Sequence, residues 1–240
     1  MSDDLWSALD QRVPAEALAW LREAVAEVEA DPAAVRTRFP MAGRKVGRGP
    51  LDAGADPDDV HAWTVDDAAR TLLLVALADD ASGELADLYR YGDAAERRGM
   101  LRALPHLGIG ADAMAIVDDA IRTNDTRLVA AALGPWATAH LDDAAYDQAV
   151  LKCVFIGVPI APLDGLPARA TPETARMLAA FVHERVAAGR DIPAEVWGVI
   201  DRFPPAAELA AIEAERESEY PDRREAAERA LRHHQNGGVR

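Results

Sequence analysis

Hydrophobic residues recur at helical spacing along nearly the whole chain, and this periodicity restricts the possible folds more than any other feature. The clearest stripe runs through Val65, Ala68 and Leu72, which lie on one face of a helix with 3.6 residues per turn. No long stretch alternates apolar with polar residues, as a half-buried β-strand would. The pattern therefore predicts an all-α protein.

The predicted helices form pairs, because residues that begin helices recur at intervals of roughly 30 residues, a length typical of helical hairpins. Pairs are expected to begin near Val65, Asp93 and Asp125, and the two aspartates have a side chain favoured at helix N-termini. Hairpins of this kind bury their apolar faces against their neighbours. We expect helical hairpins stacked as a short HEAT-like α-solenoid, with an irregular helical bundle as the alternative.

An irregular segment interrupts the helical pattern between residues 40 and 62. Glycine and proline are frequent there, at Gly43, Gly47, Gly49, Pro50, Gly54 and Pro57. Loops of this length in compact domains tend to be functional or disordered. After Pro204-Pro205 the chain is dense in charge, as in a solvated or frayed terminal helix. We expect one all-helical domain over residues 1–205, with an irregular basic loop at 40–62, and a charged C-terminal helical tail at 206–240.

The charge balance restricts the classes of partner. The 240 residues include 26 Lys+Arg and 41 Asp+Glu, which gives a formal net charge of -15. This acidic excess argues against generic binding to nucleic acid or anionic membranes, where affinity comes from many summed cation contacts. Half of the residues are hydrophobic, which excludes a disordered acidic chain.

The cysteine count and the N-terminal segment indicate the compartment. The single cysteine, Cys153, excludes a disulfide framework and a cysteine-based zinc site. The acidic N-terminus shows no secretory signal. The longest apolar run, residues 153–163, contains two prolines and is too short to cross a bilayer. We expect a soluble cytoplasmic protein without membrane insertion.

Three cations stand together in the irregular segment of this acidic chain, at Arg44, Lys45 and Arg48. No acidic residue lies between residues 41 and 51. Glycine lets the backbone approach a ligand closely, so cations beside Gly43 suggest an anion-binding nest. The segment lacks the Gly-Lys-Ser/Thr ending of a phosphate-binding P-loop. The alternative is a basic loop tied by ion pairs to the acidic body.

Lysine occurs at two positions only, Lys45 and Lys152, in a chain that otherwise uses arginine. An ammonium group differs from a guanidinium group in geometry and hydration, so both positions are candidates for ligand contacts. Lys152 lies in an apolar helix, residues 149–156, that we expect to be buried nearly all round. Such a lysine touches an anionic or carbonyl ligand in a pocket, or it pairs with an acid from another helix.

Further polar residues complete a candidate anion site. Arg98 and Arg102 share a helix face, and Asn124 lies at a turn where such residues ordinarily cap helices. The candidate residues are Arg44, Lys45, Arg48, Arg70, Glu96, Arg98, Arg102, Asn124 and Lys152. We expect the cations to converge on one cleft with surplus positive charge, covered by residues 42–48. If acidic side chains paired all of them, the cations would instead be structural.

The sequence contains no recognised catalytic, metal-binding or cofactor-binding motif. It lacks His-Glu-x-x-His, a Gly-x-Ser-x-Gly elbow and a dinucleotide fingerprint. We expect no catalytic residue, no metal and no cofactor, which favours a non-catalytic protein that binds an anionic metabolite or a protein partner. The alternatives are an enzyme in which Lys152 forms a Schiff base or Glu96 acts as a general acid/base, and a purely structural helical scaffold.

Several unusual sequence blocks, taken in order, resemble the EboA family of bacterial proteins. The blocks are Ala42-Gly43-Arg44-Lys45-Val46-Gly47-Arg48, Trp63-Thr64-Val65-Asp66-Asp67-Ala68-Ala69-Arg70, Gly92-Asp93-Ala94-Ala95-Glu96-Arg97-Arg98, Leu101-Arg102-Ala103-Leu104-Pro105, Arg122-Thr123-Asn124-Asp125 and Ala149-Val150-Leu151-Lys152-Cys153-Val154-Phe155-Ile156-Gly157-Val158-Pro159. The resemblance covers roughly residues 14 to 200.

The resemblance implies a function in traffic. Proteins similar to EboA belong to a bacterial gene cluster associated with moving secondary-metabolite precursors to the cell envelope. The implied partners are an anionic metabolite or other proteins of that cluster, including a prenyltransferase-like membrane protein. The resemblance implies no reaction and no catalytic residue.

Overall fold

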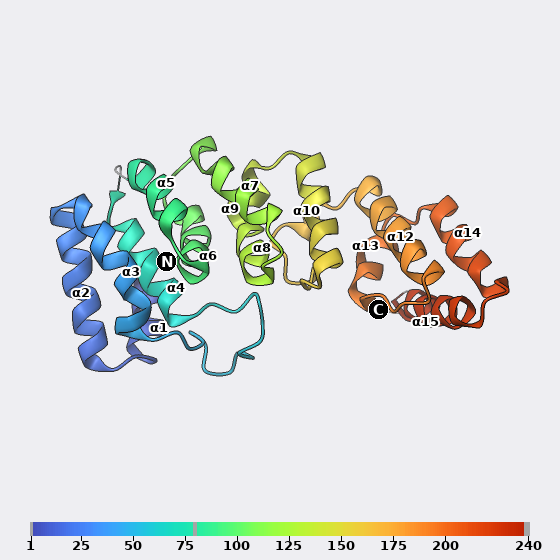
Figure 1. Cartoon of the computed structure of the whole chain (residues 1–240), viewed down its shortest axis with the longest axis horizontal. Helices are drawn as coiled ribbons and strands as arrows, with labels where there is room; N and C mark the ends of the chain where they lie inside the picture. Colours follow the sequence, from blue (N-terminus) through green and yellow to red (C-terminus); the bar gives the residue numbers. More distant parts are fainter. Residues whose placement is uncertain (1, 79–80, 238–240) are drawn as a thin grey trace. The chain divides into compact units, whose positions relative to one another are not determined.

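The structure, a computed structural model, describes residues 2–78 and 81–237, apart from the side chains at 81, 82 and 235–237. These residues form fifteen α-helices and no β-strand, which confirms the all-α prediction. The chain divides into two compact units, Met1–His140 and Leu141–Arg240 (Figure 1). The HEAT-like stacking of hairpins stays a prediction.

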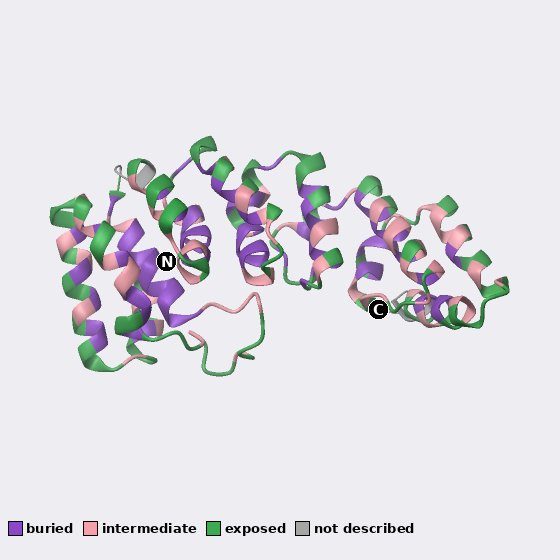
Figure 2. Cartoon of the chain, viewed as in Figure 1, coloured by how far each residue is buried: buried purple, intermediate pink, exposed green. Residues whose placement is uncertain are grey.

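The first unit contains nine of the α-helices found in the described residues. They are α1 (Ser2–Asp10), α2 (Ala15–Ala30), α3 (Val35–Val46), α4 (Val65–Val75), α5 (Ala81–Tyr91), α6 (Ala94–Ala103), α7 (Met114–Arg122), α8 (Thr126–Ala132) and α9 (Pro135–His140). The central element is α4, because every residue from 65 to 74 is buried (Figure 2). Both α3 and α6 pack against it.

Capping boxes begin α4 and α6, the two helices that carry four of the nine candidate residues. The Thr64 side chain accepts a hydrogen bond from the Asp67 backbone N–H, and the Asp67 carboxylate accepts one from the Thr64 N–H. Asp93 and Glu96 make the same reciprocal pair at the start of α6. Each box satisfies N–H groups that a helix start leaves unpaired. Both starts are therefore defined by local sequence.

The expected loop at 40–62 begins later than predicted, because α3 continues through Pro40 to Val46. The proline removes one helical hydrogen bond but does not end the helix. Phe39, Ala42 and Val46 are buried against the rest of the unit, and this packing stabilises the last turns of α3. The helix ends at Gly47, whose φ of 92° suits glycine. Residues 42–46 are thus helical, and the loop prediction is wrong for them.

The segment between α3 and α4 is irregular, and arginines from three other parts of the first unit hold it in place. Their guanidinium groups donate to its backbone carbonyls: Arg12 to Pro50 at 3.2 and 3.3 Å, Arg127 to Pro57 at 2.8 Å, and Arg102 to Val60, His61 and Ala62 at 3.3, 3.1 and 2.9 Å. These bonds satisfy carbonyls that lie outside regular structure. The cations around this segment therefore position backbone.

The second unit contains the remaining helices of the described residues. They are α10 (Asp143–Ile156), α11 (Leu166–Arg169), α12 (Pro172–Ala187), α13 (Trp197–Ile200), α14 (Ala206–Ala214) and α15 (Pro221–Gly237). Both α14 and α15 pack against α12, and Ile212 and Ala227 are fully buried. His183 of α12 lies 3.4 Å from Glu215, and His234 of α15 contacts Asp201 at 2.5 Å. The charged C-terminal segment is therefore packed as part of this unit.

The exposure of α10 differs from the prediction. One side of the helix is buried, through Ala149, Val150 and Cys153. Lys152 is only partly buried, and 74% of Phe155 is exposed. The expectation of a helix buried nearly all round is wrong, because an apolar composition hides which face has no partner. Within the described residues, no helix has both the length and the apolar character that a membrane crossing needs.

Candidate functional site

Three predicted site residues, Arg70, Arg98 and Arg102, meet between α4 and α6 with Asp66 and Asp67. The buried guanidinium of Arg70 donates a hydrogen bond to Asp66. Nε of Arg98 lies 2.9 and 3.1 Å from the two carboxylate oxygens of Asp67. Nε of Arg102 lies 3.3 Å from the same carboxylate. Three guanidinium groups and two carboxylates thus form one ion-pair network.

The network lies in the interior of the unit. Arg70 has no exposed surface, and Arg98 and Arg102 are 8% and 7% exposed. Burial lowers the pKa of Arg102. A buried charge is tolerated when polar partners compensate it, and here two aspartates and the loop carbonyls bound by Arg102 surround the three guanidinium groups. The expected convergence holds for these three arginines, but the expected open cleft at them is wrong.

Two glycines let α3 and α6 approach the Arg70 side chain closely. A Cβ atom at Gly99 would lie 2.9 Å from Cδ of Arg70, and one at Gly43 would lie 3.3 Å from its Nη2. The guanidinium also lies 5.5 Å from the centre of the Phe39 ring. Gly43 therefore provides space for a packed helix. The predicted anion-binding nest is wrong, because residues 43–46 form the last turn of α3.

The basic residues at the end of α3 lie at the surface. Arg44, Lys45 and Arg48 are exposed, and Arg48 reaches Asp93 at 3.7 Å with both side chains more than half in solvent. Cations in the last turn of a helix are favoured by the helix dipole. The structure therefore separates the predicted cations of the first unit into three exposed residues and three buried ones.

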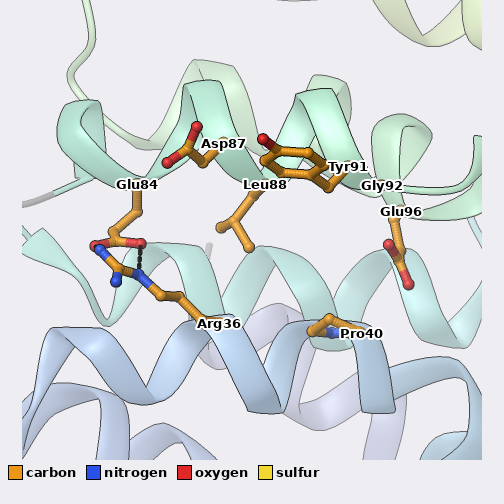
Figure 3. A pocket seen from close by; sticks show the side chains of 8 residues that line it. All are labelled: Arg36, Pro40, Glu84, Asp87, Leu88, Tyr91, Gly92 and Glu96. Carbon is orange, nitrogen blue, oxygen red and sulfur yellow. Dashed lines mark hydrogen bonds and ion pairs between the residues drawn. The ribbon is translucent and has the colours of Figure 1, made fainter.

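Glu96 lines a different pocket, of about 280 Å³, between α3 and α5 (Figure 3). The residues around it are Arg36, Pro40, Glu84, Asp87, Leu88, Tyr91, Gly92 and Glu96. Arg36 and Glu84 form two hydrogen bonds of 2.9 Å at one end, and Glu96 lies at the other. The hydrogen bond from Arg36 lowers the pKa of Glu84. This pocket is acidic, so Glu96 does not join the cations.

Asn124 is exposed in the turn between α7 and α8. Its neighbour Asp125 caps α8 by accepting hydrogen bonds from the N–H groups of Arg127 and Leu128, at 3.0 and 3.1 Å. Capping is the ordinary role of an aspartate at this position. Helix capping therefore explains the residue type at Asp125, next to Asn124.

Lys152 lines a groove of about 450 Å³ between α10 and α12 in the second unit. The other residues of this groove are Gln148, Leu151, Phe155, Arg176, Met177, Ala180, Phe181 and Glu184. The lining combines two cations and one carboxylate with aromatic and aliphatic side chains. A concave apolar surface with a few polar groups is the usual form of a small-molecule site. We call this surface the Lys152 groove.

The Lys152 groove has a defined direction, because α10 and α12 run parallel. Near the start of both helices, Oγ1 of Thr174 donates to Asp147 at 2.6 Å. Gln148 and Arg176 follow at this end, and Phe155 and Glu184 lie towards the ends of their helices. Each helix rises about 1.5 Å per residue, so the lining extends over roughly 10 Å.

Arg176 was not among the predicted residues. It makes two hydrogen bonds with Glu173, at 2.6 and 2.8 Å, and lies 3.7 Å from Glu208. The sequence signal that could have identified it is its place beside Met177 and Phe181, two apolar residues one helical turn apart. The spacing of residues within one helix does not show which residues of another helix they contact.

The comparison with protein families decides the relationship. A family model described as Metabolite traffic protein EboA matches residues 1–201. The chain belongs to the EboA family. No curated protein and no solved structure matches this EboA-family chain. All the predicted site residues, together with Arg176, lie inside the region that the EboA model matches.

The environment of Cys153 makes its thiol a poor nucleophile in this EboA-family protein. The Cys153 thiol is buried, and burial raises its pKa to about 12. A protonated thiol is a poor nucleophile. Across the described residues, no three or more His, Cys, Asp or Glu side chains are grouped to hold a metal ion.

Proposed function

We propose that this EboA-family protein is a non-catalytic accessory protein that binds an anionic metabolite, and that the Lys152 groove is its binding site. The observation that carries the proposal is the placement of Lys152 and Arg176 around one apolar groove. Ammonium and guanidinium groups hold carboxylates and phosphates by charge-assisted hydrogen bonds. The family description, metabolite traffic protein, agrees with a binding role.

The overall negative charge of the chain restricts where an anion can bind. With a net charge of -15, the protein repels anions on average, so binding relies on contacts with particular cationic side chains. Two cations and one carboxylate line the Lys152 groove, and Glu173 and Glu208 pair with Arg176. Glu173 holds the guanidinium of Arg176 through Nε and Nη2, which orients the group. We propose that a bound anion contacts the Lys152 ammonium and Nη1 of Arg176, which lies 3.7 Å from Glu208.

The environments of the candidate catalytic residues support a non-catalytic role. Glu96 and Lys152 line different cavities, the first in the first unit and the second in the second unit. Glu96 is already the second member of a capping box. Lys152 is partly exposed, whereas Schiff-base lysines are activated by desolvation or by a neighbouring cation.

Calorimetric titration with inorganic phosphate, diphosphate and benzoate tests the proposal. We expect saturable binding of at least one anion, weakened about tenfold or more in Lys152→Gln because a charge-assisted contact is lost. The matched control is Lys45→Gln, which removes the other lysine from an exposed helix end and should leave the affinity unchanged. Absence of binding at millimolar concentrations, or equal weakening by both variants, would contradict the proposal.

A further inference from the structure

The Lys152 groove has an apolar half that anion binding alone does not require. Phe155 is 74% exposed, and the other large hydrophobic side chains exposed among the described residues are Tyr91 and Tyr220. Both tyrosines carry a hydroxyl group that water can solvate, whereas the phenylalanine does not. Phe155 lies in the groove with Phe181 and Met177. An exposed apolar surface bordered by charges is typical of a binding site.

The charges fix an orientation for any elongated ligand. Arg176 and Glu184 lie eight residues apart on α12, which is about 12 Å along the helix axis. Lys152 lies on α10 between the Gln148 end and Phe155. An anionic group is therefore attracted to Lys152 and repelled by Glu184, and at Arg176 it competes with Glu173 and Glu208 for the guanidinium. The apolar side chains lie along the direction that the rest of the ligand would take.

We infer that the ligand of the Lys152 groove is a single-chain amphiphile, with one phosphate or carboxylate head at Lys152 and Arg176 and a hydrocarbon body against Met177, Phe155 and Phe181. This inference rests on the proposed function, because it assigns a ligand class to the same site. Charge complementarity selects the head, and the contiguous apolar lining selects the body. The groove volume of about 450 Å³ lies within the range of small-molecule sites.

A series of ligands with one head and increasing chain length tests the inference in the full chain. Inorganic phosphate, butyl phosphate and octyl phosphate are titrated calorimetrically below their micellar concentrations. Each buried methylene favours binding, and in this open groove we expect affinity to rise about twofold or more per methylene until the groove is filled. Octanol, which lacks the anionic head, should bind at least tenfold more weakly than octyl phosphate.

Variants separate this inference from the proposed function. Phe155→Ser should weaken octyl phosphate about tenfold and leave inorganic phosphate unchanged, and it should not unfold the protein because Phe155 is mostly exposed. Phe181→Ala should act in the same direction. Tyr220→Ser is the matched control, since this exposed residue of the second unit lies outside the groove lining.

The outcomes distinguish two failures. If phosphate binds with Lys152 dependence but affinity does not change with chain length, the amphiphile inference is wrong and the proposed function stands. If none of phosphate, diphosphate, benzoate and the alkyl phosphates binds, both are wrong. If Phe155→Ser instead abolishes self-association and alkyl phosphates do not compete with it, the apolar half is a contact between copies and the inference is overturned.

Discussion

Arg70 is buried in the interior of the first unit, where its guanidinium group donates a hydrogen bond to Asp66. Replacing Asp66 by Asn would leave a buried guanidinium without its carboxylate. We expect Asp66→Asn to lower the free energy of unfolding by about 3 kcal/mol or more. Urea denaturation followed by circular dichroism measures the loss.

The control for this prediction is an exposed ion pair of the same unit. Arg122 and Asp119 lie 3.5 Å apart and are 68% and 46% exposed. Exposed pairs contribute little, so Arg122→Gln should leave the urea midpoint unchanged. Equal effects of the Asp66 and Arg122 substitutions would show that the buried network does not stabilise the unit.

Gly99 is predicted to be intolerant of even a methyl group. The Cβ of Gly99→Ala would lie 2.9 Å from Cδ of Arg70, so α4 and α6 would have to separate. We expect a loss of about 1–3 kcal/mol, against the gain that alanine normally gives in a helix. Gly83→Ala in α5 is the control, because no atom lies within 4 Å of its Cβ position. A neutral Gly99→Ala in thermal unfolding would contradict the packing described.

Cys153 should be unreactive in the folded protein. Its pKa is raised to about 12 by burial, so few thiolates exist at mildly alkaline pH. We expect iodoacetamide to modify the native protein far more slowly than the protein in urea. A Ser7→Cys variant supplies an exposed thiol for comparison. Modification of Cys153 at the rate of that exposed thiol would be incompatible with its burial.

At the level of helices, the Arg36–Glu84 ion pair between α3 and α5 should weaken in acid. The hydrogen bond from Arg36 lowers the pKa of Glu84 from its ordinary value of 4.5. A carboxylate with a lowered folded-state pKa stabilises the fold above its unfolded pKa, and this contribution disappears as pH falls through the folded value. The stability difference between wild type and Glu84→Gln should therefore vanish in acid. A difference that persists or grows below the lowered pKa would contradict this pairing.

The helix starts could be predicted from the sequence, but the end of α3 could not. Asp93 and Asp125 have the residue type that caps helices, and both do so in the structure. From the sequence alone, Pro40 predicts the end of a helix. Its helix persists because Phe39 and Ala42 are buried by partners more distant in the chain. Local signals thus identify starts, whereas packing decides where this helix ends.

The candidate site was predictable only in part, for a related reason. The cationic residue types of Arg70 and Arg102 are visible in the sequence, but their burial depends on the approach of α6 to α4. Lys152 was identified by its rarity. Arg176 and Phe181 were not, because they reach the same groove from another helix. Contacts between helices decide which residues share a site, and the periodicity within one helix does not reveal them.

At the scale of the whole molecule, the cationic side chains lie in two kinds of environment. In the first unit, buried arginines and arginines bound to loop carbonyls stabilise the fold. In the second unit, Lys152 and Arg176 line a groove. The family match extends over the first unit and into the second as far as residue 201. We propose that the Lys152 groove binds an anionic metabolite.

The chain offers a direct measurement of that claim, because it contains two lysines. Reductive ¹³C-methylation keeps the charge of both and gives each an NMR signal, assigned with Lys45→Gln and Lys152→Gln. On titration with inorganic phosphate and octyl phosphate, we predict a saturable shift of the Lys152 signal and an unchanged Lys45 signal. A Lys152 signal that stays in place at millimolar ligand, or moves no more than that of Lys45, would contradict the account.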